Sequence, residues 1–275
     1  EAIIASSGYD LLSEILLFGI INGFTVKEVP LQYSKRDYAL SKSQNIFFRA
    51  AYWKTFFRFW KLRNSIQACD YDARGYSSPI PIQWYWHRRR YAIIMKNLPV
   101  INGSLPKTEN SSILDIGCGS SMIIQHLPNA VALDVVFSKL RYLKKTNKKR
   151  IAASVFSLPF QDKAFNTIII SEVIEHIPKK KEIFEELVRV LQPNGTLIIG
   201  TPDYGTLSWT VIEWIYDKFK NTYGHEHITH YTQESLLEIL KEHGFVVEKV
   251  DYICQGDMIL KARLLQEDET KQKGK

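Results

Sequence analysis

The stretch Ile113-Leu-Asp-Ile-Gly-Cys-Gly119 decides how this chain folds. Its first four residues form the run of a short buried strand, and the glycines follow where the chain must turn into a helix. Glycine lets a ligand approach the backbone at such a turn, and the helix that follows has free N–H groups at its start. Asp134 ends the next predicted strand, where a carboxylate can accept hydrogen bonds from both vicinal hydroxyls of a ribose. The pattern predicts a nucleoside-binding turn, with a tight turn beside a solvated acid as the alternative.

The residues of this turn favour one nucleoside over another. A dinucleotide site usually has a third glycine, and Met122 stands at that position here. Asp115, two residues before the first glycine, would face a phosphate unfavourably, but it suits a ligand with a positively charged amino group. The turn therefore indicates S-adenosylmethionine rather than NAD.

Strand and helix patterns alternate on both sides of this stretch. The predicted strands are 113–116, 130–133, 151–153, 167–171, 196–201, 246–251 and 257–263. The predicted helices are 83–98, 120–127, 137–145, 180–191 and 232–243, the last with Thr232 as its N-cap and Gly244 as its stop. Residues 193–195 read as a turn. These repeated units predict an α/β fold: a Rossmann-like, doubly wound, seven-stranded, mostly parallel sheet that binds ligands at the carboxyl ends of its strands.

Composition bounds the class of protein. The chain has 275 residues, a formal net charge of +7 and an apolar fraction of 45%, which is typical of a globular protein. Its three cysteines form no CxxC pair, which argues against a structural zinc site and for a reducing compartment. The longest apolar run, Ile15–Ile21, is far shorter than the roughly 20 residues of a membrane span, and no signal peptide is visible. We expect a cytoplasmic protein, either free or peripheral at the inner face of the membrane.

Five motifs in order resemble those of class I S-adenosylmethionine-dependent methyltransferases, closest to the branch with the ubiquinone-biosynthesis O-methyltransferases. They are Leu114–Gly119, Ala132–Asp134, Leu158–Phe160 with Ala164–Asn166, Ser171–His176 and Leu191–Gly195. The resemblance covers about 100–265 and implies cofactor contacts from Asp115, Gly117 and Gly119 (methionine end), Asp134 (ribose), Val135, Ser154 and Val155 (adenine) and Ser171 (amino group). Two positions depart from the family pattern. Ser121 replaces a third glycine, and Ser154 replaces a frequent Asp.

The segment after the fourth predicted strand holds the candidate catalytic residues. His176 is the candidate base that accepts a proton from the acceptor, with Glu172 and Glu175 beside it. The Glu-x-x-Glu-His spacing also resembles a metal-binding motif of some quinone O-methyltransferases, so a divalent ion is a second interpretation. The third is that Glu175 and His176 only order the loop. The family resemblance favours His225, His227 and His230 as substrate contacts, with loop packing as the alternative, and we assign no metal ligand.

The N-terminal zone, 1–66, is aromatic and basic. On a helical wheel Phe48, Tyr52, Trp53, Phe56, Phe57, Phe59 and Trp60 share one face, opposite Lys54, Arg58 and Lys61. This pattern favours an amphipathic helix over 46–62 at a membrane surface, with a core or partner-binding helix as the alternative.

The same zone shows a second resemblance. Gly8–Asp10, Gly23–Val26, Glu28–Pro30 and Ser41-Lys42 resemble the C-terminal end of polyprenyl-phosphate glycosyltransferases of the dolichol-phosphate mannosyltransferase type. The resemblance covers 8–62 and lacks that family's nucleotide-sugar site. We expect the chain to have four parts: this zone at 1–66, a linker with a capping helix at 67–110, the methyltransferase domain at 111–265 and a disordered tail at 266–275. The chain begins with Glu1, and a longer fused protein is one explanation.

These observations predict a methyltransferase that uses S-adenosylmethionine, with or without a divalent metal. The expected acceptor is an oxygen of a lipid-linked or membrane-proximal glycan or polyprenoid. The basic charge suggests an RNA methyltransferase as a rival. Against nucleic acid, Ser171-Glu-Val-Ile lacks the Asn/Asp-Pro-Pro-aromatic signature of amino-nitrogen base methylation. The other rival is a non-catalytic scaffold for a membrane glycosyltransferase.

Overall fold

The computed structural model describes residues 4, 10–32, 46–99, 112–127, 129–146, 149–218 and 227–266, with only the backbone described for 46–49 and 215–218. The predictions for Gly8, Ser41-Lys42, the side chain of Phe48, the end of the linker at 100–110, His225 and the tail 267–275 lie outside this description.

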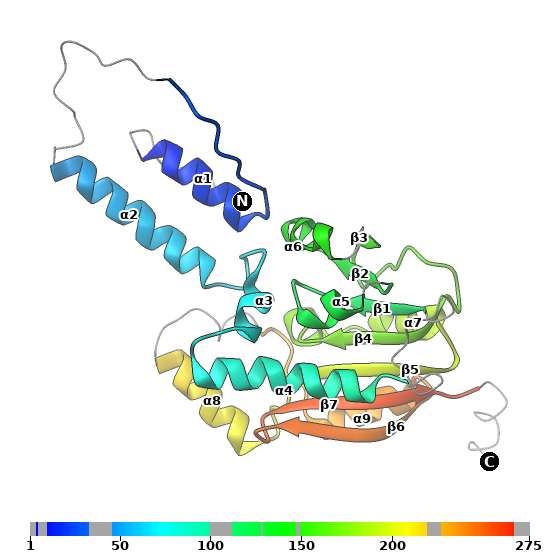
Figure 1. Cartoon of the computed structure of the whole chain (residues 1–275). Helices are drawn as coiled ribbons and strands as arrows, with labels where there is room; N and C mark the ends of the chain where they lie inside the picture. The colour runs from blue at the N-terminus through cyan, green and yellow to red at the C-terminus, as the bar shows by residue number, and fades with distance from the viewer. Residues whose placement is uncertain are drawn as a thin grey trace, which may run out of the picture.

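A seven-stranded sheet forms the centre of the molecule (Figure 1). Its strands are β1 (Ile113–Ile116), β2 (Val131–Asp134), β3 (Arg150–Ala152), β4 (Phe165–Ser171), β5 (Leu191–Pro202), β6 (Phe245–Ile253) and β7 (Asp257–Leu264). They lie in the order β3-β2-β1-β4-β5-β7-β6. Within this sheet β7 pairs antiparallel with β5 and β6, and the other neighbours pair in parallel. The predicted mostly parallel, seven-stranded sheet is confirmed.

Helices occupy most of the remaining described chain. They are α1 (Leu11–Ile21), α2 (Ile46–Arg63), α3 (Tyr71–Tyr76), α4 (Pro81–Asn97), α5 (Met122–His126), α6 (Phe137–Tyr142), α7 (Lys181–Val190), α8 (Leu207–Lys218) and α9 (Gln233–Glu242). Two 3-10 turns are η2 (Leu143–Lys145) and η3 (Ile174–His176). Thr232 caps α9 through a capping box with Ser235, as predicted. Ser121, the departure from the family's third glycine, caps α5 by accepting a hydrogen bond from the Ile124 N–H.

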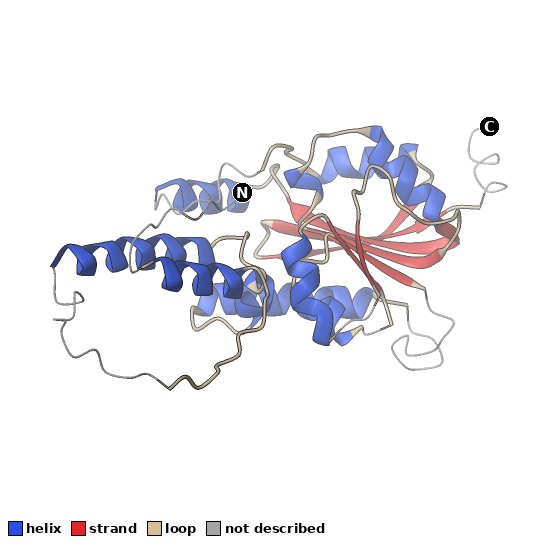
Figure 2. Ribbon diagram, turned by 90° about the horizontal axis from the view of Figure 1, so that it is seen from above, coloured by secondary structure: helices blue, strands red, loops and turns tan. Residues whose placement is uncertain are grey.

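The sheet is covered by helices on both faces (Figure 2). Ile168 and Ile170 of β4 are fully buried in one apolar cluster with residues of α7 and α9. Ile169, between them, is fully buried in a second cluster with residues of α4, α5 and α6. Because successive side chains of a strand point to opposite faces, a strand buried on both sides must be apolar throughout.

The start of β5 differs from the prediction of a separate turn at 193–195. Leu191 pairs with Phe165 and Thr196 pairs with Thr167, so the intervening residues bulge out of the register. Asn194 adopts a left-handed backbone there, with φ 60°. The turn therefore exists as a bulge within the strand, because pairing resumes on both sides of it.

The N-terminal helices α1 and α2 pack against each other and lead through α3 to the sheet. Phe59 of α2 is buried beside Ile21 of α1, so the prediction that Phe59 lies on the outer aromatic face is wrong. At 100° per residue, Phe59 shares the face of Thr55, which is the face toward α1. The base of the pair is fixed to the sheet domain, because Arg141 of α6 donates to the Asn22 carbonyl at 2.7 Å. Among the described residues, no helix is long and apolar enough to span a membrane.

Candidate active site

The turn after β1 has the backbone that its two glycines require. Gly117 and Gly119 have φ values of 64° and 54°, the left-handed region that glycine enters at little cost. A side chain at Gly117 would also collide with Val173. The Asp134 carboxylate accepts hydrogen bonds from the Gly119 N–H at 2.8 Å and the Val136 N–H at 2.7 Å. The end of β2 therefore holds the turn after β1 through one buried acid.

Asp72 of α3, a carboxylate that the sequence did not indicate, also contacts this turn. Asp72 accepts hydrogen bonds from the Ser120 N–H at 2.9 Å and the Ser120 hydroxyl at 3.2 Å, and its carboxylate lies 3.8 Å from the Lys139 ammonium. Burial opposes its ionisation, but Lys139 and the Ser120 N–H outweigh burial and lower the pKa of Asp72. Asp72 lies in a zone that reads as a linker, so no strand or glycine pattern marked it.

Asp115 faces this negative charge. Burial, and then repulsion from Asp134 and Asp72, raise the pKa of Asp115 well above its usual value. Its Oδ2 is buried without a hydrogen-bond partner among the described residues. A buried orphan acceptor beside two other carboxylates suits a ligand that brings a cation or a hydrogen-bond donor.

The other predicted cofactor residues lie around the same edge of the sheet. Val135 follows Asp134 and is 69% exposed, which leaves its side chain open to a planar ring. Ser154 follows β3 and accepts a hydrogen bond from the Phe156 N–H at 3.3 Å, while Val155 is buried in the core. The Ser171 hydroxyl at the end of β4 is buried without a hydrogen-bond partner in the part of the chain described. These positions remain predictions of cofactor contact.

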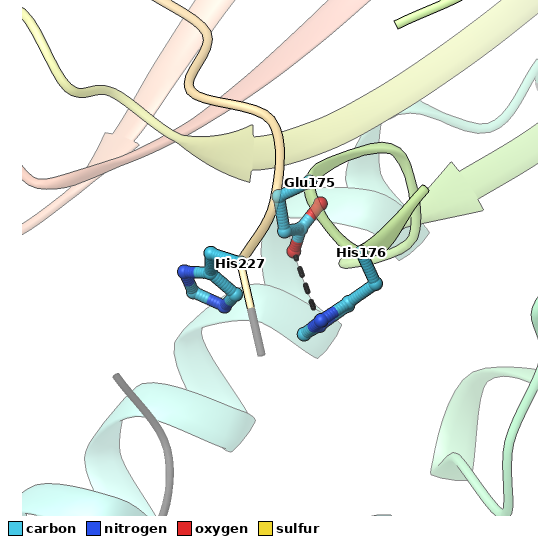
Figure 3. A group of neighbouring side chains, drawn as sticks. All are labelled: Glu175, His176 and His227. Carbon is cyan, nitrogen blue, oxygen red and sulfur yellow. Dashed lines mark ion pairs between the residues drawn. The ribbon is translucent and has the colours of Figure 1, made fainter. Parts of the chain in front are cut away.

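Glu175, His176 and His227 converge beyond the end of β4 (Figure 3). One ligand atom from each lies within 4.8 Å of the others. The Glu175 carboxylate is fully buried, lies 3.9 Å from the His176 ring nitrogen and accepts a hydrogen bond from Thr201 at 3.1 Å. Burial raises the pKa of Glu175 to about 8, and burial with repulsion from His176 lowers the pKa of His227 to about 4. The structure thus joins residues of two segments that the sequence assigned separately to catalysis and to substrate contact.

Glu172 has a different environment from its two predicted catalytic neighbours. It adopts a left-handed backbone with φ 57°, which is strained for a residue with a side chain. Its carboxylate forms an ion pair with Arg90 of α4 at 2.8 Å, and the same guanidinium contacts Asp257 at 2.8 Å. Burial raises the pKa of Glu172 well above its usual value despite Arg90. This contact network places Glu172 in the joint between α4, β4 and β7, and Arg90 and Asp257 are further polar residues that sequence patterns did not indicate.

Aromatic side chains surround the histidines. The Tyr204 hydroxyl lies 2.8 Å from Nδ1 of His227, and the Tyr204 ring stacks on His230 at 4.0 Å. Trp209 of α8 stacks on His227 at 6.0 Å. His230 is exposed and His227 is half-buried, and Tyr204 contacts both of them. An imidazole and aromatic wall of this kind can receive a ring or the apolar face of a sugar.

Known proteins resemble the part of the chain that contains the glycine turn and its acids. Residues 85–250 match the model of a methyltransferase domain. The ubiquinone biosynthesis O-methyltransferase of Rickettsia akari is 34% identical over 118 residues, which are 40% of this chain and 46% of that enzyme. The chain thus aligns with less than half of that enzyme's length.

Solved structures agree with the fold. One is a complex of the Haloferax volcanii Trm112 methyltransferase activator with a protein named provisionally as a methyltransferase. It is 14% identical with a TM-score of 0.53, and the match covers 72% of this chain and 97% of the solved one. Another, from Listeria monocytogenes, is named provisionally as an S-adenosylmethionine-dependent methyltransferase. It is 14% identical with a TM-score of 0.50, over 65% of this chain and 100% of that one.

Proposed function

Because this chain belongs to the methyltransferase-domain family, we propose that it methylates an oxygen of a lipid-linked or membrane-proximal glycan or polyprenoid. The chain is a methyltransferase, and its methyl donor is S-adenosylmethionine. The observation that carries the proposal is the position of the Glu175–His176–His227 group at the same edge of the sheet as the glycine turn and Asp134.

The donor pocket is proposed from the residues around the turn. Asp134 is the partner for the ribose hydroxyls, and Val135 packs against the adenine. Asp115, with its unpartnered Oδ2, faces the amino group. When bound, S-adenosylmethionine supplies a methyl group already activated on a sulfonium. The chain's own task is therefore to align the acceptor oxygen with that methyl carbon and to receive the acceptor's proton.

His176 is the proposed proton acceptor. Its ring nitrogen lies 3.9 Å from Oε1 of Glu175. Because burial raises the pKa of Glu175 to about 8, this side chain is mostly protonated near neutral pH, and it stabilises the imidazolium only in its ionised form. His227 stays neutral at physiological pH, because burial and neighbouring histidines hold its pKa at about 4. A neutral His227 can accept or donate one hydrogen bond without competing with His176 for the acceptor's proton.

A divalent metal ion is the alternative way to activate the acceptor at this place. Glu175 Oε1 is buried without a hydrogen-bond partner among the described residues, and the three ligand atoms lie within 4.8 Å of one another. One carboxylate and two imidazoles form a donor set that binds first-row divalent ions. Glu175, His176 and His227 would hold the ion, and it would lower the pKa of an acceptor hydroxyl.

The substrate class rests on the N-terminal zone. The segment 8–62 resembles the end of a polyprenyl-phosphate glycosyltransferase, and 46–62 carries the aromatic and basic pattern of a membrane-surface helix. The same proposal includes the boundary at 66 between the N-terminal zone and the linker, and the boundary at 110 between the linker and the methyltransferase domain. A substrate in or near the membrane is consistent with the imidazole and aromatic wall.

The test is calorimetric titration with S-adenosylmethionine, followed by transfer of a labelled methyl group into a lipid extract. We expect binding by the native chain, weaker binding by Asp134→Ala, and transfer that His176→Asn reduces at least about a hundredfold. Binding with no transfer to any lipid extract would favour the scaffold instead. Label in a ribonuclease-sensitive product would favour RNA. Stimulation by added Mn²⁺ or Zn²⁺ that Glu175→Gln abolishes would assign the metal mechanism.

A further inference from the structure

The α1–α2 pair has its polar contacts on the inside. The Thr55 hydroxyl donates to Asp10 at 2.9 Å across the two helices, and Arg58 forms an ion pair with Glu14. Glu14 is only 1% exposed. Two soluble helices that pack against each other usually bury apolar side chains and expose their charges. An apolar cluster lies near the base of the pair: Ile21 and Phe59 with Ala68, and Leu17, Phe18 and Leu62 packed against them.

Many other apolar side chains of the pair lie on the outside. On α1 the exposed set is Leu12, Ile15, Leu16 and Ile20, and on α2 it is Trp53, Phe56, Phe57 and Trp60. Leu12 is 77% exposed, and Trp53 and Phe57 are each 58% exposed. The rings of Trp53 and Phe57 stack at 5.8 Å, so the aromatic residues form a continuous surface. At 100° per residue, Leu12 and Leu16 lie on the side of α1 opposite Glu14, and Trp53 and Phe57 lie on the side of α2 opposite Thr55. The two apolar faces therefore point away from each other, and the aromatic face of α2 is the candidate interaction site.

Charge indicates what covers this surface. Lys54 and Lys61 are exposed on α2, at positions seven residues apart that share one side of the helix. At 100° per residue they lie about 40–60° around the helix from Phe57, so they border the aromatic stripe, and the prediction that they lie opposite it is wrong. The two acids of this pair, Asp10 and Glu14, are buried against Thr55 and Arg58. An apolar stripe of Trp and Phe with cations beside it matches the boundary between the headgroups and acyl chains of an anionic bilayer.

Length excludes the alternative that α1 crosses the bilayer. Its 11 residues span about 16 Å, roughly half the thickness of the hydrocarbon core.

We propose that the outer, aromatic face of α2 docks on the surface of an anionic membrane. The inference deepens the proposed function by placing the enzyme at its substrate, and it rests on that function only for the identity of the acceptor. The hairpin continues into α3, whose Asp72 contacts Ser120 in the glycine turn. Figure 1 shows α3 between α2 and the sheet. Docking would therefore bring the membrane to the side of the molecule that carries the active site.

Co-sedimentation of the full chain with lipid vesicles tests the proposal. We expect binding to vesicles of equal parts phosphatidylcholine and phosphatidylglycerol, with a blue shift of tryptophan emission, and weak binding to phosphatidylcholine alone. Trp53→Ser with Phe57→Ser should weaken binding about tenfold or more. The matched control is Ile80→Ser with Ile82→Ser, two apolar residues of similar exposure at the start of α4, which should bind as the native chain does.

Two further measurements test the role of charge and check that the variants are folded. Lys54→Gln with Lys61→Gln should weaken binding to the anionic vesicles roughly thirtyfold and leave binding to phosphatidylcholine unchanged. Retained S-adenosylmethionine binding shows that each variant is folded.

Three results would overturn the inference: no preference for anionic vesicles, undiminished binding by the Trp53 and Phe57 variant, or a dimer in solution that this variant dissociates. The last result would make the surface a contact between copies. Failure of methyl transfer with intact vesicle binding would refute the proposed function and leave the docking surface standing.

Discussion

Asp134→Asn is the substitution that separates cofactor recognition from the structure of the glycine turn. The native carboxylate accepts two short hydrogen bonds from backbone N–H groups, at 2.8 Å from Gly119 and 2.7 Å from Val136. Asparagine keeps one acceptor oxygen and presents an NH2 group to the other N–H. Loss of one charge-assisted hydrogen bond should lower the free energy of unfolding by about 1–2 kcal/mol, because relief of the repulsion on Asp115 offsets part of the loss.

The effect on the cofactor should be larger. The carboxylate is the expected partner of two ribose hydroxyls, and replacing charge-assisted bonds by one neutral bond should cost about 3 kcal/mol, or roughly a hundredfold in Kd. Calorimetric titration with S-adenosylmethionine measures the Kd, and urea denaturation of the ligand-free chain measures stability. Asp162→Asn, a change at an exposed acid that pairs with Arg189, is the control. A folded Asp134→Asn variant that binds the cofactor within about threefold of the native Kd would refute the role of Asp134.

Three further changes test other parts of the site. Asp72→Asn should reduce the preference for cationic S-adenosylmethionine over S-adenosylhomocysteine about three- to tenfold, and an unchanged ratio of the two Kd values would exclude an electrostatic role. The native chain should lose stability as pH falls from 6.5 to about 4, because His227 takes up a proton there in the unfolded chain, whereas its pKa in the folded chain is about 4. His227→Gln should make this loss about 1–2 kcal/mol smaller. Urea titrations across this pH range measure the loss, and parallel curves of stability against pH for the two chains would contradict the prediction. Gly117→Ala should cost about 2 kcal/mol or more through its positive φ and its collision with Val173, whereas Gly19→Ala, in an open helical position, should be neutral or stabilising by thermal denaturation.

The sheet could be predicted because its signals are local. The strand predicted at 167–171 reads as apolar from its sequence alone, and burial on both faces requires that composition. Thr232 and Gly244 bound α9 through capping and a left-handed turn that a few neighbouring residues decide. The acid at the end of β2 could be placed near Gly119 because parallel strands end at the same edge of a sheet.

The missed residues share a different property, since long-range packing alone brings them to the site. Asp72 is 48 residues from Ser120 in the sequence, and Arg90 is 167 residues from Asp257. No helical or strand period connects such pairs. The face of Phe59 was wrong for the same reason, because a helical wheel shows which residues are apolar but not which side meets α1.

The distribution of charge, rather than its sum, decides between ligands. The chain as a whole carries +7, which suggested nucleic acid as a partner. The glycine turn, however, is surrounded by the carboxylates of Asp72, Asp115 and Asp134, with Lys139 as the cation beside Asp72. A phosphate would be repelled there, while a ligand with an ammonium and a sulfonium group would relieve the repulsion that raises the pKa of Asp115. The exposed Lys54 and Lys61 belong to a separate surface on α2. The basic balance therefore argues for an anionic partner outside the pocket, and the pocket itself argues for a cationic cofactor.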